Sequence, residues 1–203
     1  MQKPIDFDEV QGYGERQPLP PGGYICRIMK VEETSSKKGA EMLIISLDIA
    51  EGEYKDYYAK GYRSDTRPDK KWGCSVCQLT YDPVNPRSTN KGFKTFTTAV
   101  CKSNQGFVIP WGDKFGEGFK GKFVGVIFRR EQFIGTDGNT HFSTKAYQFR
   151  STDTIREGVS VPEDKLLDSQ PAQQTNNNPP VQNSGVVDLS DFEEIPVGAD
   201  LPF

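Results

Sequence analysis

The chain has 203 residues, of which only 34% are hydrophobic, and it contains 20 Gly and 14 Pro. This is enough apolar material for the core of one ordinary domain if about forty C-terminal residues are left out. No run approaches the length of a membrane span, and the N-terminal residues lack the apolar stretch of a signal peptide. We therefore expect a cytoplasmic protein whose four cysteines stay reduced.

Charge is divided unevenly along the chain. Residues 162–203 carry eight acids and one base, whereas residues 55–156 carry eighteen bases and nine acids. A basic middle attracts a polyanion, and an acidic tail can occupy the same surface when the polyanion is absent. The charge pattern therefore favours a polyanion-binding domain followed by an acidic tail.

The first half of the chain contains three candidate strands. Residues 1–19 are polar and rich in Gly and Pro, which predicts an arm that leads to a turn. A first strand begins at Tyr24, and residues 42–49 are rich in β-branched side chains, as is typical of a buried central strand. Residues 54–62, with four tyrosines, are the third candidate. Residues 63–91 have no regular period and predict a long irregular insertion, and such loops often have a function.

The second half contains a helix and a hairpin. From Gly92 the period becomes helical, and one face carries the apolar residues Phe93, Phe96, Val100 and Cys101. Residues 122–130 predict a strand, residues 136–139 a hairpin turn of the Asp-Gly type, and residues 142–150 the returning strand. Residues 162–187 are dominated by Gln, Asn and Pro and predict a disordered linker.

Three strands, a helix and a two-strand hairpin are the element order of an OB-fold. That fold is a five-stranded barrel with a helix between strands three and four, and it often binds single strands. A small β-sandwich or another β-barrel with a helix would give the same order. We predict a mainly β, OB-like domain at residues 20–161, then the linker, then a disordered acidic tip at residues 188–203.

Basic and aromatic side chains alternate in several places, which suits single-stranded nucleic acid. Such binding needs aromatic faces on which bases stack and a basic groove that follows the phosphates. The alternative is that the aromatic residues form the core and that the Lys and Arg side chains are solvated surface charges. We favour this alternative for Phe93, Phe96 and Phe123, and it stays open for Tyr58, Tyr62, Trp72 and Tyr147. The predicted binding residues are Tyr58, Tyr62, Arg63, Lys70, Lys71, Trp72, Trp111, Arg129, Arg130, Phe133, Lys145 and Tyr147.

The signals for metal binding and catalysis are weak. Cys74 and Cys77 have the spacing of half a zinc site, and Cys101 and the single histidine, His141, would have to supply the other ligands. A complete zinc site usually has two pairs of closely spaced ligands, but Cys101 and His141 are far apart in the sequence. We therefore predict no metal and no cofactor. The chain has no Gly-rich phosphate loop, no Gly-x-Ser-x-Gly and no His pair, so we expect no enzyme.

The last residues form a peptide-like ligand. Pro202 limits the backbone freedom lost on docking, and Phe203 can fill an apolar pocket while nearby carboxylates meet basic groups. This ending is similar to the acidic C-terminal tip of bacterial single-stranded DNA-binding proteins, with Leu201 in place of an isoleucine. The alternative is a solvated acidic tail of no special role. The resemblance implies a partner-binding tip made of Asp191, Phe192, Glu193, Glu194, Asp200, Leu201, Pro202 and Phe203.

A second resemblance covers the predicted domain. It is carried by residues 20–28, 37–43, 120–131, 137–138 and 151–158. These stretches resemble a family of phage and prophage proteins from replication and recombination modules, which are regarded as single-strand-binding-like. The resemblance implies a phage protein in the cytoplasm of an infected bacterium and supplies no catalytic residue.

We therefore expect a sequence-nonspecific single-stranded DNA-binding protein of phage replication or recombination. Its tip would recruit replication or recombination proteins and compete with DNA for the basic groove. One alternative is a protein-binding adaptor of the phage replication complex that does not bind DNA. The other is a metal-dependent nuclease or a zinc protein. The sequence leaves the oligomeric state open, and a homo-oligomer is compatible with it.

Overall fold

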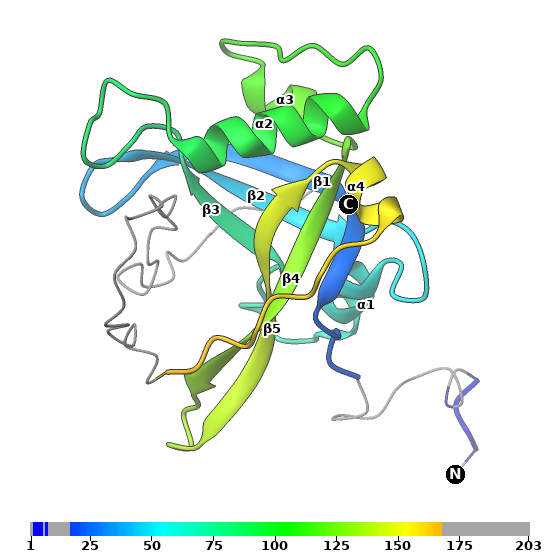
Figure 1. The fold of residues 1–203 in the computed structure, drawn as a ribbon. Helices are drawn as coiled ribbons and strands as arrows, with labels where there is room; N and C mark the ends of the chain where they lie inside the picture. Colours follow the sequence, from blue (N-terminus) through cyan, green and yellow to red (C-terminus); the bar gives the residue numbers. More distant parts are fainter. Residues whose placement is uncertain (1, 6, 8–16, 168–203) are drawn as a thin grey trace.

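The computed structural model of the chain describes residues 2–5, 7 and 17–167. Its centre is a five-stranded antiparallel sheet with the strand order β3-β2-β1-β4-β5. The strands are β1 (Gly22–Ser35), β2 (Glu41–Ile49), β3 (Ser75–Leu79), β4 (Phe123–Ile134) and β5 (Thr140–Arg150). The helices are α1 (Tyr57–Ser64), α2 (Lys91–Ser103), α3 (Phe115–Phe119) and α4 (Thr152–Glu157). Figure 1 shows α2 and α3 together at one end of the sheet, whereas the far ends of β4 and β5 project from the other end.

The core lies between the sheet and α2. Ile28 of β1 and Ile45 of β2 are wholly buried, as is Phe96 of α2. The ring of Phe96 stacks on Phe119 of α3 with centroids 5.3 Å apart. Burial of these side chains is the main stabilising contribution, because each one removes a large apolar area from water.

The predicted mainly β class is confirmed, but the sheet is open. β1 is central and pairs with β2 on one side and β4 on the other. β3 and β5 are the two edges, and the strands that the structure describes do not close a barrel between them.

The prediction of a third strand at residues 54–62 is wrong, because Tyr57–Ser64 form α1. Asp48 of β2 supplies the helix cap. Its Oδ1 accepts the N–H of Tyr58 at 2.9 Å and its Oδ2 accepts the N–H of Ala59 at 3.2 Å. Asp48 is wholly buried, and burial is the main reason why its pKa is raised. A side chain from another element thus satisfies the first N–H groups of α1, which no local pattern indicates.

The irregular insertion predicted at residues 63–91 is wrong in part. β3 lies within it and pairs antiparallel with β2 along its whole length. Only Leu79 of this strand is buried. Pairing with β2 therefore defines β3, rather than an apolar pattern of its own.

The predicted helix is confirmed as α2. Asn90 caps it, since its side chain accepts the N–H groups of Gly92 and Phe93 at 2.8 and 3.3 Å. Phe96 and Val100, both expected on the apolar face, are wholly buried. The short helix α3 follows before β4 and was not expected.

The predicted hairpin is confirmed as β4 and β5. Residues 135–139 join the two strands, and Gly138 adopts a φ of 76°, which favours glycine. A bulge at Tyr147 interrupts the register, since Ile127 pairs with Gln148 but Phe128 pairs with Ala146.

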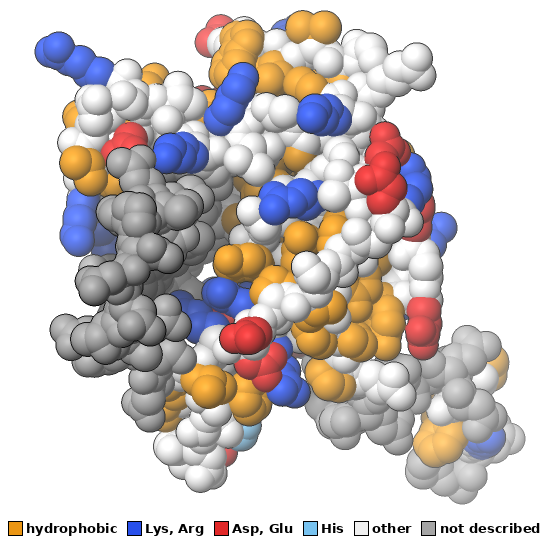
Figure 2. All heavy atoms as spheres, in the orientation of Figure 1, with side chains coloured by type: hydrophobic (Ala, Val, Ile, Leu, Met, Phe, Trp, Pro, Cys, Tyr) orange, Lys and Arg blue, Asp and Glu red, His pale blue; other side chains and the backbone are white. Residues whose placement is uncertain are grey.

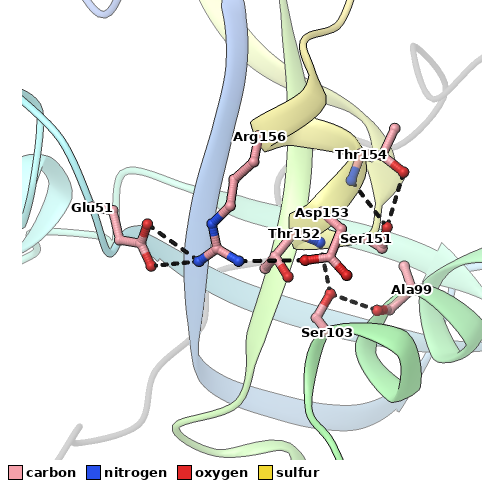
Figure 3. Close-up of polar contacts among 8 residues, drawn as sticks. All are labelled: Glu51, Ala99, Ser103, Ser151, Thr152, Asp153, Thr154 and Arg156. Carbon is pink, nitrogen blue, oxygen red and sulfur yellow. Dashed lines mark hydrogen bonds and ion pairs between the residues drawn. The ribbon is translucent and has the colours of Figure 1, made fainter.

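The helix α4 is fixed to the end of α2 by hydroxyl groups (Figure 3). Ser151 caps α4, because its Oγ accepts the N–H of Thr154 at 3.3 Å. Ser103 Oγ accepts the N–H of Thr152 at 3.0 Å and donates to the carbonyl of Ala99 at 2.7 Å. These bonds orient the first turn of α4 against the core.

The other side of α4 is held by charge and by close packing. Arg156 lies between two carboxylates, with Nη2 3.1 Å from Glu51 and Nη1 3.4 Å from Asp153 (Figure 3). Gly125 of β4 makes room for the helix, since a Cβ at this position would lie 2.5 Å from Cγ1 of Ile155. α4 therefore covers β4 close to its start.

Replacing Ser151 with alanine is expected to lower the free energy of unfolding by about 1 kcal/mol, the usual cost of losing a helix cap. Urea unfolding followed by circular dichroism measures this change. Ser160→Ala, at an exposed position beyond the helix, is the control and is expected to change nothing measurable. Equal effects for the two variants would contradict the capping role.

Both ends of the described chain differ from the predicted arm and linker. Leu19, within the predicted arm, is 3% exposed and belongs to the core. Lys165, within the predicted linker, forms a parallel bridge with Glu131 of β4. The remaining linker and the tip at residues 188–203 lie outside the described residues. No helix in the part of the chain described here is long and apolar enough to cross a bilayer.

Candidate nucleic-acid interface

The far half of the β4–β5 hairpin carries alternating cations and aromatic rings. β1 stops pairing with β4 at Phe128, so the hairpin continues beyond the core. The guanidinium carbon of Arg129 lies 4.2 Å from the ring centroid of Tyr147, and that of Arg130 lies 4.5 Å from the ring centroid of Phe142. Lys145 is directly opposite Arg129 in the register and is exposed. The hairpin thus joins residues that suit both phosphates and bases.

Acidic neighbours partly neutralise this hairpin. Arg129 Nη2 pairs with Glu131 Oε1 at 2.6 Å, while its buried Nε makes no hydrogen bond within the described structure. Arg130 donates to Asp164, which raises the pKa of the guanidinium. Lys145 has no ion pair of this kind among the described residues. A polyanion therefore meets one accessible ammonium group and two guanidinium groups that already have carboxylate partners.

The tip of the hairpin holds Phe133 and His141. Phe133 is 40% exposed, and its ring centroid lies 5.7 Å from that of His141. His141 Nε2 is 3.0 Å from both carboxylate oxygens of Asp137. Hydrogen bonds from Asn139 and then His141 lower the pKa of Asp137. These contacts stabilise the turn and leave the Phe133 ring partly open to a ligand.

A second cluster joins α1 to the following loop. The rings of Tyr62 and Trp72 have centroids 5.6 Å apart, and Nζ of Lys70 lies 4.5 Å from the Tyr62 centroid. The indole N–H of Trp72 donates to the carbonyl of Leu47 at 2.8 Å, so the half-buried ring has a fixed position. The predicted binding residues Arg63 and Lys71 are exposed beside this cluster. The structure therefore brings together the predicted residues Tyr62, Arg63, Lys70, Lys71 and Trp72.

Tyr58, another predicted binding residue, lies in the core. It is 7% exposed and its ring stacks on Phe128 with centroids 6.5 Å apart. Its neighbour Tyr57 instead lies half-buried, with its centroid 5.1 Å from that of Tyr58. The Tyr58 ring thus packs within the protein, and we do not assign it to the interface.

Sequence reasoning missed two half-buried tyrosines next to this site. Tyr24 of β1 contacts both Tyr54 and Phe128, with centroids 6.1 and 5.5 Å apart. Burial, and then the neighbouring Tyr54, raise the pKa of Tyr24 to about 12. The clustering of tyrosines at residues 54–62 was visible in the sequence, but the approach of Tyr24 depends on the fold.

These tyrosines lie close to the base of the hairpin. Phe128 and Arg130 are alternate residues of β4 and therefore point to the same side of the sheet. The tyrosine contacts to Phe128 consequently continue into the Arg130–Phe142 pair. Figure 2 shows hydrophobic side chains gathered in the middle of one face of the molecule, with Lys and Arg side chains around them.

Trp111 lies apart from the other predicted residues. It is 67% exposed and stacks on Phe115 of α3 with centroids 5.4 Å apart. α3 is at the end of the sheet opposite the hairpin tip (Figure 1). The structure therefore does not bring Trp111 to the interface.

The weak metal candidates are distributed over separate elements. Cys74 precedes β3 and is buried, which raises the pKa of its thiol to about 12. Cys77 lies in β3, Cys101 in α2 and His141 at the hairpin tip. Across residues 2–5, 7 and 17–167, the structure has no cluster of three or more His, Cys, Asp or Glu side chains that could hold a metal ion.

Comparison of the chain with protein-family models gives no match, and comparison with curated proteins gives none either.

Proposed function

We propose that this protein binds single-stranded DNA without sequence preference. The observation that carries the proposal is the pair of guanidinium–ring contacts, Arg129 on Tyr147 and Arg130 on Phe142, on a hairpin that extends beyond the core. Guanidinium groups bind phosphate, and aromatic rings stack on bases of any sequence at about 1–3 kcal/mol per base.

Under this proposal the two clusters bind one strand. Arg129, Lys145, Tyr147 and Phe133 lie on one face of the hairpin, and Arg130 and Phe142 lie on the other, because successive residues of a strand point to opposite sides. A strand that wraps around the hairpin contacts the cations through its phosphates and stacks its bases on the rings of both faces. The Tyr62–Trp72 pair, with Lys70 beside it, stacks with further bases. α1 and β4 meet at the contact of Tyr58 with Phe128, so α1 lies on the side of β4 that also carries Arg130 and Phe142.

The order of the strands supports an OB-like architecture. In such a Greek-key barrel the first strand lies between the second and the fourth, and a helix follows the third. The present sheet has these neighbours, with α2 between β3 and β4. We therefore propose an OB-like barrel that is open between β3 and β5.

The two resemblances extend the proposal to the biological setting. The tip, which includes Asp200, Leu201, Pro202 and Phe203, would recruit replication or recombination proteins of a phage or its host. The protein would act in the cytoplasm of an infected bacterium, without a catalytic step or a cofactor.

Titration with oligo-dT tests the proposal through the fluorescence of Trp72. Quenching is expected with oligo-dT but not with a duplex of equal length, because stacking requires unpaired bases. Raising the salt concentration is expected to weaken binding, with a log–log slope of about −0.7 for each phosphate contact. A Trp111→Phe variant restricts the signal to Trp72.

Failure of the intact chain to bind oligo-dT at low salt would overturn this function. The protein-binding adaptor would then be the leading alternative. Cleavage of the strand in the presence of a divalent metal would instead support the nuclease.

A further inference from the structure

The segment that follows α4 runs back across the sheet to the candidate interface. We call residues 161–167 the strap. Figure 1 shows it passing from α4 along β4 towards the far half of the hairpin. The N–H of Lys165 donates to the carbonyl of Arg130 at 2.9 Å, and the N–H of Gln132 donates to the carbonyl of Lys165 at 2.8 Å. The strap thus pairs with β4 beyond Phe128, along the edge where β1 no longer pairs with β4.

The strap also places a carboxylate on the hairpin. Both Nε and Nη2 of Arg130 donate to Oδ2 of Asp164, the first at 2.8 Å. Because the two donors converge on one oxygen, this contact is not the two-oxygen fork in which a guanidinium binds most strongly. A phosphodiester offers two oxygens with the spacing that the fork requires.

Little apolar burial holds the strap in place. Val161, Leu166 and Leu167 are 46–50% exposed. In the Arg130–Asp164 pair, the side chains are 48% and 29% exposed, and such exposed ion pairs contribute little to stability. Segments with few buried contacts and few backbone hydrogen bonds open at low free-energy cost. The strap therefore has the properties of an element that a competing ligand can displace.

We propose that a phosphate of bound single-stranded DNA replaces Asp164 on Arg130 and that the strap then leaves the edge of β4. This inference rests on the proposed function and adds a regulatory step to it. Asp164 occupies the guanidinium in the free protein, so each binding event exchanges one anion for another.

The first test compares two strap variants of the full chain that lose one negative charge each. Asp164→Asn is expected to bind oligo-dT about fivefold more tightly at low salt, since the phosphate no longer displaces a charged partner. Glu163→Gln is the matched control, because Glu163 is the exposed neighbour in the same segment. Glu163→Gln is expected to change the affinity for oligo-dT by less than about twofold, because Glu163 does not pair with Arg130 and an exposed charge has only a weak effect.

The second test follows the strap by limited trypsin digestion at Lys165. Its backbone is paired with β4 in the free protein, so cleavage after Lys165 is expected to be slow. Oligo-dT is expected to accelerate this cleavage several-fold, and Asp164→Asn to accelerate it without DNA. Mass spectrometry identifies the fragment that ends at Lys165.

The outcomes separate this inference from the function on which it rests. The displacement is supported if Asp164→Asn, but not Glu163→Gln, binds oligo-dT more tightly than the wild type and if oligo-dT accelerates cleavage at Lys165. If the wild-type protein binds oligo-dT but the two variants behave alike, or cleavage at Lys165 is unchanged or slower, the displacement is wrong and the function stands. If no form binds oligo-dT, both fail.

Discussion

Replacing Arg129, Arg130 and Lys145 together with glutamine is expected to weaken oligo-dT binding on the order of a hundredfold at low salt. Each cation is assigned about 1 kcal/mol of phosphate binding, and about 3 kcal/mol corresponds to this factor. The log–log salt dependence should become shallower by about two, because three phosphate contacts are lost. Fluorescence titration over a range of salt concentrations measures both quantities.

Glutamine is chosen because it can still donate to Glu131, the partner of Arg129. The control removes the same charge from exposed lysines at the opposite end of the sheet, as Lys102→Gln, Lys114→Gln and Lys120→Gln. This control is expected to keep most of the affinity. Equal losses in the two triple variants would show that overall charge, rather than the hairpin, attracts the DNA. Thermal unfolding of each variant checks that the fold is kept.

Replacing Asp48 with alanine is expected to lower the free energy of unfolding by about 3 kcal/mol at neutral pH. The carboxylate is wholly buried and accepts the N–H groups of Ile49, Tyr58 and Ala59. Alanine leaves these donors without an acceptor, and each buried unsatisfied group costs about 1–3 kcal/mol before relaxation. Urea unfolding measures the loss, and Asp113→Ala, at an exposed position, is expected to have almost no effect.

The effect of Asp48 also depends on pH in a defined direction. Burial raises the pKa of Asp48 above its ordinary value of 3.8 in the folded protein. The folded state therefore binds the proton more tightly than the unfolded state, and this group's contribution to stability falls as the pH rises from 3.8 to the raised pKa. The difference between wild type and Asp48→Ala is expected to narrow over that window and then to stay constant. A difference that widens with pH would contradict the raised pKa.

Local sequence patterns correctly predicted the elements whose apolar residues recur with a regular period. The β-branched residues of β2 and the helical spacing of Phe96 and Val100 in α2 predicted both elements. Local patterns failed where the conformation of a segment depends on contacts with residues far away in the sequence. The tyrosine-rich segment at 54–62 was predicted as a strand, but residues 57–64 form α1, whose first N–H groups are accepted by the buried carboxylate of Asp48. β3 has little apolar pattern and forms by pairing with β2.

The same distinction holds for the candidate interface. Charge and aromatic alternation predicted Arg129, Arg130 and Tyr147 as binding residues, and the Asp-Gly turn predicted the hairpin on which Arg129 contacts Tyr147. Their role in DNA binding stays a prediction. The burial of Tyr58 could not be predicted, since it depends on the docking of α1 against Phe128. Nor could the strap, because composition at residues 162–187 suggests a linker and the contact of Asp164 with Arg130 is not local.

The central position of β1 has a consequence for how the chain folds. The β1–β2 and β4–β5 hairpins close over short turns, whereas β1 and β4 are joined across about a hundred residues. Closing a long loop costs more chain entropy than closing a turn, and folds rich in such distant pairs form slowly. The two hairpins can therefore form early, and joining them along β1 and β4 is the slow step. Until then the pairing edges of both strands are open to other chains.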